Sequence, residues 1–142
     1  ESQLIPSENN FSWGDKREYF FNGEDKSKIK NLRMDRVASF SITESKVAEE
    51  ISDNISNILN KTGLSDNDIT IFDGMACVGG NTISFSRKFG KVLSNEMNEE
   101  RFDMLKNNCA VLDLRNITFL NESILLFREG RTKGIGKVSE ID

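Results

Sequence analysis

The sequence predicts an α/β fold in which helices cover a parallel sheet. Between residues 41 and 122, helical and strand patterns alternate three times, always with the helix first. Parallel strands need crossover connections, usually helices, so this alternation favours a parallel sheet. A Gly-Gly pair just beyond the first strand is the second observation. The third is a length of 142 residues, enough for one domain with a real core.

The segment before this alternation, residues 1–40, is predicted to be a helical and aromatic N-terminal extension. Its first ten residues are polar and contain the only proline, Pro6. An aromatic cluster follows, which suits packing against a core or, in a sharper interpretation, base stacking. The cluster comprises Phe11, Trp13, Tyr19, Phe20 and Phe21.

The first strong helix signal follows Ser41, where "SITE" fits a capping box. One helical stripe then carries Val47, Ala48, Ile51, Ile55, Ile58 and Leu59, and Gly63 is expected to end the helix.

Three strands and two further helices complete the alternation. "DITIFDG" predicts the first strand, and the helix after the glycines is expected to begin near Asn81. "KVLSNEM" predicts the second strand, and Asn98 is expected to cap the next helix. "NITFLNE" predicts the third strand.

Composition narrows the classes of function. There is no histidine, and Cys77 and Cys109 are too far apart for a zinc motif, so neither a metal site nor a His-based triad is expected. No apolar run approaches a membrane span, which predicts an intracellular protein of the nucleus or cytoplasm without membrane contact. With a net charge of −4, nucleic-acid contacts would need a local patch. Two patches suit either a solvated surface or phosphate contacts: Lys26, Lys28, Lys30, Arg33 and Arg36, and Arg128, Arg131, Lys133 and Lys137.

The turn "DGMACVGG" follows the first strand, where ligands of open parallel sheets sit. Its glycines would let the backbone approach a ligand, and the next helix offers free amide groups. Glu96, 23 positions after Asp73, matches the spacing of an acid that holds ribose hydroxyls.

Two nucleotide-like ligands compete for this turn. A dinucleotide fold needs G-x-G-x-x-G, which is absent, and Asp73 would repel a pyrophosphate. The acid suits the ammonium of S-adenosylmethionine, with Gly79 and Gly80 at the amino-acid end, Glu96 at the ribose and Glu122 at the adenine. A plain alternative is a tight strand-to-helix connection without a ligand.

Four segments together resemble the RNA cap guanine-N2 methyltransferases, the trimethylguanosine synthase family. They are "FSITESKVAEEIS", "IFDGMACVGGNTISFS", "KVLSNEMNEERFDMLKNN" and "NITFLNES". The resemblance implies a Rossmann-like class I methyltransferase fold, a three-layer αβα sandwich, and S-adenosylmethionine as cofactor. It implies methyl transfer to the N2 amine of a 7-methylguanosine cap, with capped RNA as partner and a larger complex as a further option. The implied cofactor residues are Thr43, Asp73, Gly74, Met75, Ala76, Gly79, Gly80, Asn81, Thr82, Glu96, Met97, Glu122 and Ser123.

The family's Ser-Pro-Pro-Trp segment, which seats the target nitrogen and stacks the methylated guanine, has no counterpart here. Catalytic residues are therefore not predicted. We expect a cofactor-binding core over residues 41–127 that is incomplete in its C-terminal half, then a basic, Gly-containing tail over 128–142, with missing residues suspected after Leu126. A missing segment, a second half from another chain, and a relic without catalysis are the explanations considered. Alternative functions are an rRNA or DNA amino-group methyltransferase and a non-catalytic module of an RNA-processing assembly.

Overall fold

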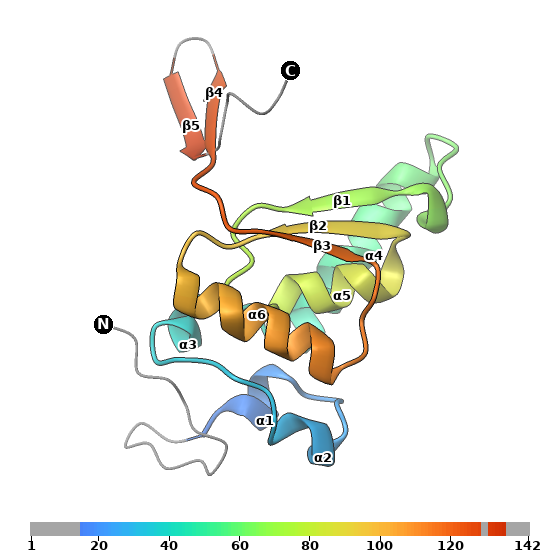
Figure 1. Cartoon of the computed structure of the whole chain (residues 1–142). Coiled ribbons are helices and arrows are strands. Elements are labelled where there is room, and N and C mark those ends of the chain that lie inside the picture. Colours follow the sequence, from blue (N-terminus) through green and yellow to red (C-terminus); the bar gives the residue numbers. More distant parts are fainter. Residues whose placement is uncertain (1–14, 129–130, 136–142) are drawn as a thin grey trace.

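The computed structural model describes residues 15–128 and 131–135, and its elements alternate as expected (Figure 1). Three short helices come first: α1 (Arg17–Phe20), α2 (Lys26–Ile29) and α3 (Ala38–Ser41). They are followed by α4 (Ser45–Asn60), the 3-10 turn η1 (Asp66–Asp68), β1 (Thr70–Asp73), α5 (Gly80–Lys88), β2 (Lys91–Asn95), α6 (Glu99–Val111) and β3 (Ile117–Leu120). A hairpin of β4 (Leu125–Arg128) and β5 (Arg131–Ile135) comes last.

The sheet has the order β1-β2-β3, and both strand pairs are parallel. In register, Asp73 lies opposite Ser94, and Asn95 lies opposite Leu120. The carboxyl ends of all three strands therefore meet at one edge. The predicted α/β fold with a parallel sheet is confirmed.

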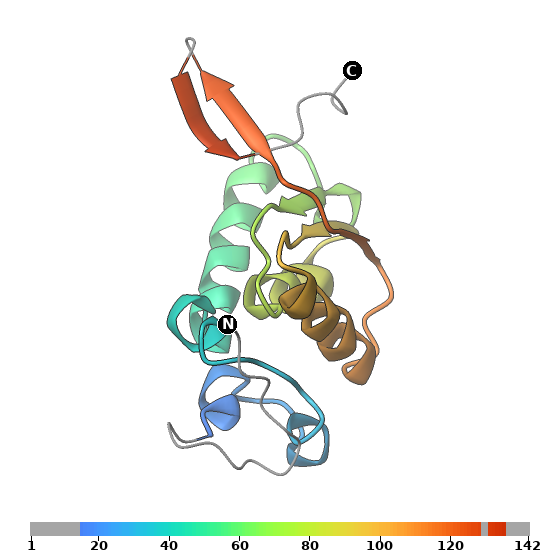
Figure 2. The same ribbon diagram turned by 60° about the vertical axis from the view of Figure 1, so that its left-hand side comes forward.

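Helices α4, α5 and α6 lie on the same face of this sheet (Figures 1 and 2). Between this face and the helices, one buried cluster contains Ile69, Phe85, Phe89 and Val92. Within the described ranges, no helix covers the opposite face of the sheet. Phe72 of β1 is accordingly 50% exposed. The described residues thus supply two of the three expected layers, the sheet and one helical layer.

Helix α4 begins three residues later than a capping box at Ser41 predicts, and that prediction is wrong. Ser41 instead ends α3, where its hydroxyl donates to the Val37 carbonyl. Glu44 is the actual N-cap, because its own carboxylate accepts from the Val47 amide at 2.8 Å. The expected C-terminal signal is confirmed, since Gly63 has φ +94° just beyond the helix.

The predicted starts of α6 and α5 agree with the structure to within one residue. Asn98 caps α6 by accepting from the Arg101 amide at 2.9 Å, as expected. Helix α5 begins at Gly80, one residue before the expected position.

Residues 15–44 share their core with the helices of the sheet layer. Phe21, Leu32 and Met34 are buried in one cluster with Val78 of the turn and Met104 of α6. Phe21 therefore packs against a core, as the plainer interpretation of the aromatic cluster predicts. Phe11 and Trp13 lie outside the described residues. The N-terminal segment from residue 15 forms one packed body with the helices.

The C-terminal segment forms an antiparallel hairpin, with Leu125 opposite Ile135 and Arg128 opposite Arg131. It extends away from the three-stranded sheet (Figures 1 and 2). Strand β4 crosses the expected boundary after residue 127, so residues 128 and 131–135 of the predicted tail belong to a hairpin.

Candidate functional site

The turn between β1 and α5 is held by its own backbone and by β2. The Ala76 amide donates to the Asn95 carbonyl at 2.8 Å, and the Gly79 amide donates to the Ala76 carbonyl at 3.0 Å. Gly79 has φ +113° and Cys77 φ +56°. The left-handed region is easy for glycine and strained for cysteine, so Cys77 keeps this conformation only because the surrounding contacts hold it there.

Asp73, the last residue of β1, is nearly buried. The residue is 9% exposed, and its carboxylate accepts from the Thr82 hydroxyl at 2.7 Å, while Thr82 also contacts the Ser94 hydroxyl at 2.7 Å. These contacts join β1, β2 and α5. Burial raises the pKa of Asp73 above its ordinary value, the bonds from Thr82 and the Met75 backbone oppose that rise, and the charge of Glu96 adds to it.

Glu96 directly follows β2, and backbone amides hold its carboxylate. One oxygen accepts from the Cys77 amide at 2.8 Å and the other from the Asn98 amide at 3.0 Å. A carboxylate offers about four lone-pair sites, so two remain for a ligand's hydroxyl groups. Glu96 therefore has a fixed orientation and spare acceptor capacity.

Asn95 joins the ends of all three strands, a role that the sequence analysis missed. Its amide nitrogen donates to the Gly74 carbonyl at 3.1 Å and the Glu122 carbonyl at 3.0 Å. Its oxygen accepts from the Glu122 amide at 3.0 Å. Its position could have indicated this role, because Asn95 is the last residue of the central strand.

A cleft of about 410 Å³ opens at these strand ends. Small-molecule sites typically measure about 300–1,000 Å³ and are mostly apolar with a few placed polar groups, as here. Five predicted site residues line it: Gly74, Met75, Glu96, Met97 and Glu122. Six other lining residues were not predicted from the sequence: Val37, Ser41, Cys77, Asn95, Arg101 and Ile124.

Several lining residues could not be found from local motifs. Val37 and Ser41 come from the N-terminal segment, and Arg101 comes from α6. Arg101 is positioned by a 3.1 Å ion pair with Asp35, which is fully buried. The wall therefore depends on packing between segments distant in sequence.

The remaining predicted site residues are not in the lining of this cleft; they are Thr43, Asp73, Ala76, Gly79, Gly80, Asn81, Thr82 and Ser123. Thr43 accepts from the Asn81 side-chain amide at 3.0 Å. A Cβ on Gly80 would lie 2.3 Å from the Thr43 carbonyl oxygen. Gly80 therefore allows α5 to approach the segment before α4. Their predicted cofactor roles remain predictions.

One detail of this group suits a cationic ligand. The Asn81 side-chain oxygen is buried and lacks a hydrogen-bond partner among the described residues. Such orphaned acceptors are uncommon in folded proteins. It lies on the first turn of α5, in the same part of the fold as the Asp73–Thr82 bond.

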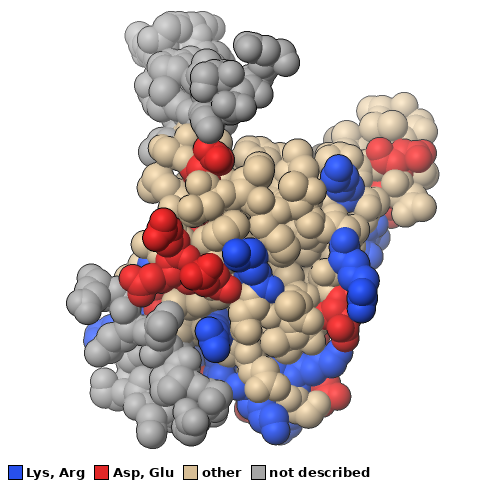
Figure 3. Space-filling model, in the orientation of Figure 1, with Lys and Arg blue, Asp and Glu red and all other residues tan. Residues whose placement is uncertain are grey.

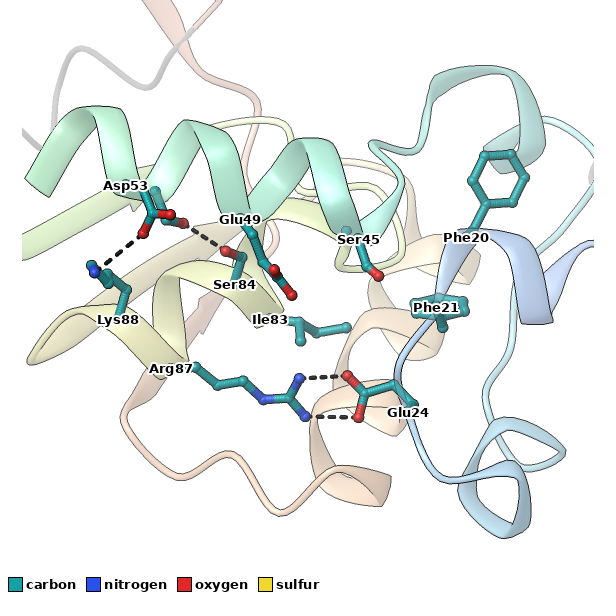
Figure 4. Close-up of a pocket in the computed structure, with 12 residues that line it drawn as sticks. Phe20, Phe21, Glu24, Ser45, Glu49, Asp53, Ile83, Ser84, Arg87 and Lys88 are labelled. Atoms are coloured by element: carbon teal, nitrogen blue, oxygen red, sulfur yellow. Dashed lines mark hydrogen bonds and ion pairs between the residues drawn. The ribbon is translucent and has the colours of Figure 1, made fainter.

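A second cavity, of about 300 Å³, lies between α4, α5 and the segment around α1 (Figure 4). Its charged groups are largely paired with one another: Arg87 with Glu24, and Lys88 with Asp53 at 3.2 Å. The paired carboxylate of Glu24 raises the pKa of Arg87 further. These ion pairs tie the N-terminal segment and α4 to α5. The cavity lies away from the strand ends, so the cleft at the strand ends remains the candidate functional site.

The described residues contain no group of three or more metal-ligating side chains placed to hold an ion. In the same residues, no helix has the length and apolar character needed to cross a bilayer.

Comparison with known proteins agrees with the resemblance in the sequence. The model of the RNA cap guanine-N2 methyltransferase family matches residues 69–126. This stretch contains β1, the turn, Glu96 and Glu122, so the resemblance is confirmed for the region that builds most of the cleft.

Two solved structures are similar to parts of the chain. Trm5b from Pyrococcus abyssi is 23% identical, with a TM-score of 0.37, and the match covers 37% of this chain and 16% of that one. The tRNA (m1A58) methyltransferase TrmI from Aquifex aeolicus is 22% identical, with a TM-score of 0.42, and the match covers 49% of this chain and 27% of that one. The matched part is thus well under two thirds of either protein.

Proposed function

We propose that this chain is an S-adenosylmethionine-dependent RNA methyltransferase and that its acceptor is the N2 amine of a 7-methylguanosine cap. The observation that carries the proposal is Glu96. Its carboxylate is fixed by two backbone amides at the end of β2 and lines a cleft beside the glycine-containing turn. The family match over residues 69–126 supports the reaction class.

The residues at the cleft fit the cofactor. Glu96 offers two further acceptor sites for the ribose hydroxyls. Gly74 leaves little room for a side chain, since a Cβ there would lie 3.0 Å from Ile124. Val37, Met97 and Ile124 give apolar walls suited to a purine ring. Asp73 and the buried, unpartnered oxygen of Asn81 lie outside the cleft lining, so their role at the ammonium group stays a prediction.

The cofactor would supply a methyl group already activated on a sulfonium. Transfer to an amine then depends mainly on positioning, so the lack of histidine is no obstacle. In this proposal Glu96 orients the ribose, and Arg101, held by Asp35, forms part of the cleft wall.

Isothermal titration with S-adenosylhomocysteine tests the cofactor assignment. Glu96→Gln, which keeps the side-chain shape, is expected to weaken binding by about 1–3 kcal/mol, or about 5- to 150-fold in Kd. Glu100→Gln is the matched control, because Glu100 is an exposed acid on α6 outside the cleft lining. Absence of binding heat, or equal affinities for the two variants, would refute the assignment.

A methyl-transfer assay then separates the acceptors. Transfer to 7-methylguanosine-capped RNA, but not to the same RNA uncapped, is expected. Transfer to uncapped rRNA or to DNA would favour an amino-group methyltransferase of another specificity. Cofactor binding without any transfer would favour the non-catalytic module.

A further inference from the structure

Three neighbouring cations stand out on the segment between α2 and α3. Lys30, Arg33 and Arg36 are exposed, and in the described part of the chain none of them has an ion-pair partner. We call them the basic strip. Lys26 and Lys28, just before it, are paired with acids.

The strip is built on a fixed backbone. Leu32 and Met34, which lie between its cations in sequence, are completely buried. The buried Asn108 of α6 accepts from the Arg33 amide at 2.7 Å and donates to the Arg33 carbonyl at 2.8 Å. Burial of the apolar side chains directs the cations outward, so the charges are presented on an ordered surface.

The strip follows α6 toward the cleft (Figures 1 and 2). Asn31 contacts Asn107 and, further along the segment, Asp35 contacts Arg101, so the contacts move back along α6 toward its first turn. Val37, the next residue after Arg36, lines the cleft. Lys30 and Arg36 are six residues apart, at most roughly 20 Å of chain.

The local charge is opposite to that of the whole chain, which is −4. Three acids near the strip are each paired with a cation outside it: Asp35 with Arg101, Asp103 with Lys106, and Asp113 with Lys28. In Figure 3, Lys and Arg side chains lie in the lower part of the face and along its right side, a group of acidic side chains lies at its left, and the upper part is mostly uncharged. A positive strip on an acidic protein favours a localised polyanion.

We infer that the basic strip binds the phosphates of the RNA substrate and leads the strand to the cleft. This inference rests on the proposed function for the identity of the polyanion. RNA backbones present regularly spaced negative charges, and neutralising them releases counterions, so such binding weakens steeply with salt. An ordered row of cations ending at the site matches that chemistry.

The test is the salt dependence of RNA binding. Fluorescence anisotropy with a labelled single-stranded oligouridine would compare the full chain with the triple variant Lys30→Gln, Arg33→Gln, Arg36→Gln. Each lost phosphate contact changes the slope of log K against log salt by about 0.7. The triple variant is therefore expected to lower the magnitude of the slope by about 2.

The control triple variant is Lys46→Gln, Lys61→Gln, Lys91→Gln. It removes the same charge from three exposed positions on α4, beyond its end and at the start of β2. Its slope should match that of the unmodified chain. Equal slopes for the chain and the strip variant, or equal losses in both variants, would overturn the inference.

Two further measurements distinguish a failure of this inference from a failure of the proposed function. Titration with S-adenosylhomocysteine should give the same affinity for the strip variant and the unmodified chain, which also shows that the variant is folded. A chain that binds RNA through the strip but never binds this ligand would overturn the proposed function alone. Binding of poly-glutamate as tight as that of oligouridine at the same salt would overturn RNA as the occupant.

Discussion

Replacement of Gly80 by alanine separates two explanations for the glycine pair. If Gly80 only lets a ligand approach, alanine should leave the free protein unchanged or stabilise it by up to about 1 kcal/mol, because alanine favours helices. In the structure, however, the new Cβ would lie 2.3 Å from the Thr43 carbonyl oxygen and 2.9 Å from Ile42 Cγ1. Since the nearer atom belongs to the backbone, α5 must shift away from the segment before α4.

Overpacking of this kind costs about 1–3 kcal/mol, and the upper part of that range applies because a backbone atom cannot rotate away. After subtraction of the helix preference, the net loss is about 2 kcal/mol. For a chain of this length that corresponds to about 8 °C in Tm.

The assay is thermal unfolding followed by circular dichroism, without ligand. Gly23→Ala is the control: its φ of +95° makes alanine strained there, but a Cβ would meet nothing within 4 Å. It isolates backbone strain, about 1–2 kcal/mol. An unchanged or higher Tm for Gly80→Ala would refute the packing explanation.

Three further outcomes are expected. Asn108→Ala should lower the free energy of unfolding, measured in urea, by about 3 kcal/mol, because it removes buried hydrogen bonds to two segments. The control Asn107→Ala should lower it by under about 1 kcal/mol. Equal urea midpoints for the two variants would contradict this prediction. The raised pKa of Asp73 means that the folded state binds the extra proton, so the free energy of unfolding falls as pH rises from about 3.8 through the folded pKa. Asp73→Asn should lack this fall, and its stability at neutral pH should match or exceed that of the unmodified chain. Urea midpoints measured from about pH 4 to 7 check this pH dependence. The same variant should bind S-adenosylhomocysteine more weakly. Burial raises the pKa of Cys109 to about 12 and also raises the pKa of Cys77, so a thiol reagent should react slowly with Cys77 and hardly at all with Cys109. Because Cys77 lines the cleft, S-adenosylhomocysteine should slow its reaction further. Fast reaction of both thiols in the native chain would contradict this prediction.

The strands and longer helices were predictable because their signals are local. Asn98 caps α6 through its own side chain, and the apolar residues of β1 and β2 lie within single short runs. The start of α4 was not, because Ser41 is a preferred capping residue and Glu44 is not. In the structure Ser41 ends α3 and Glu44 caps α4.

In the candidate site, too, some features were predictable from local sequence and others were not. Asp73, the glycine turn and Glu96 could be found by spacing, since a parallel strand, a turn and a helix place them at fixed separations. The sequence could not distinguish a glycine that faces a ligand from one that faces a neighbouring backbone, as Gly80 does. It also could not show that the Asp73 carboxylate is nearly buried.

The sequence by itself determined the class of fold, the edge of the sheet that carries the candidate site, and the acid at the end of β2, because periodicity and strand ends are properties of neighbouring residues. Only the tertiary structure decided the walls of the cleft. Val37 and Arg101 reach it because the N-terminal segment packs on α6 through the Asp35–Arg101 and Arg33–Asn108 contacts. These contacts join residues 66 and 75 positions apart, and no local pattern encodes a pairing at that distance.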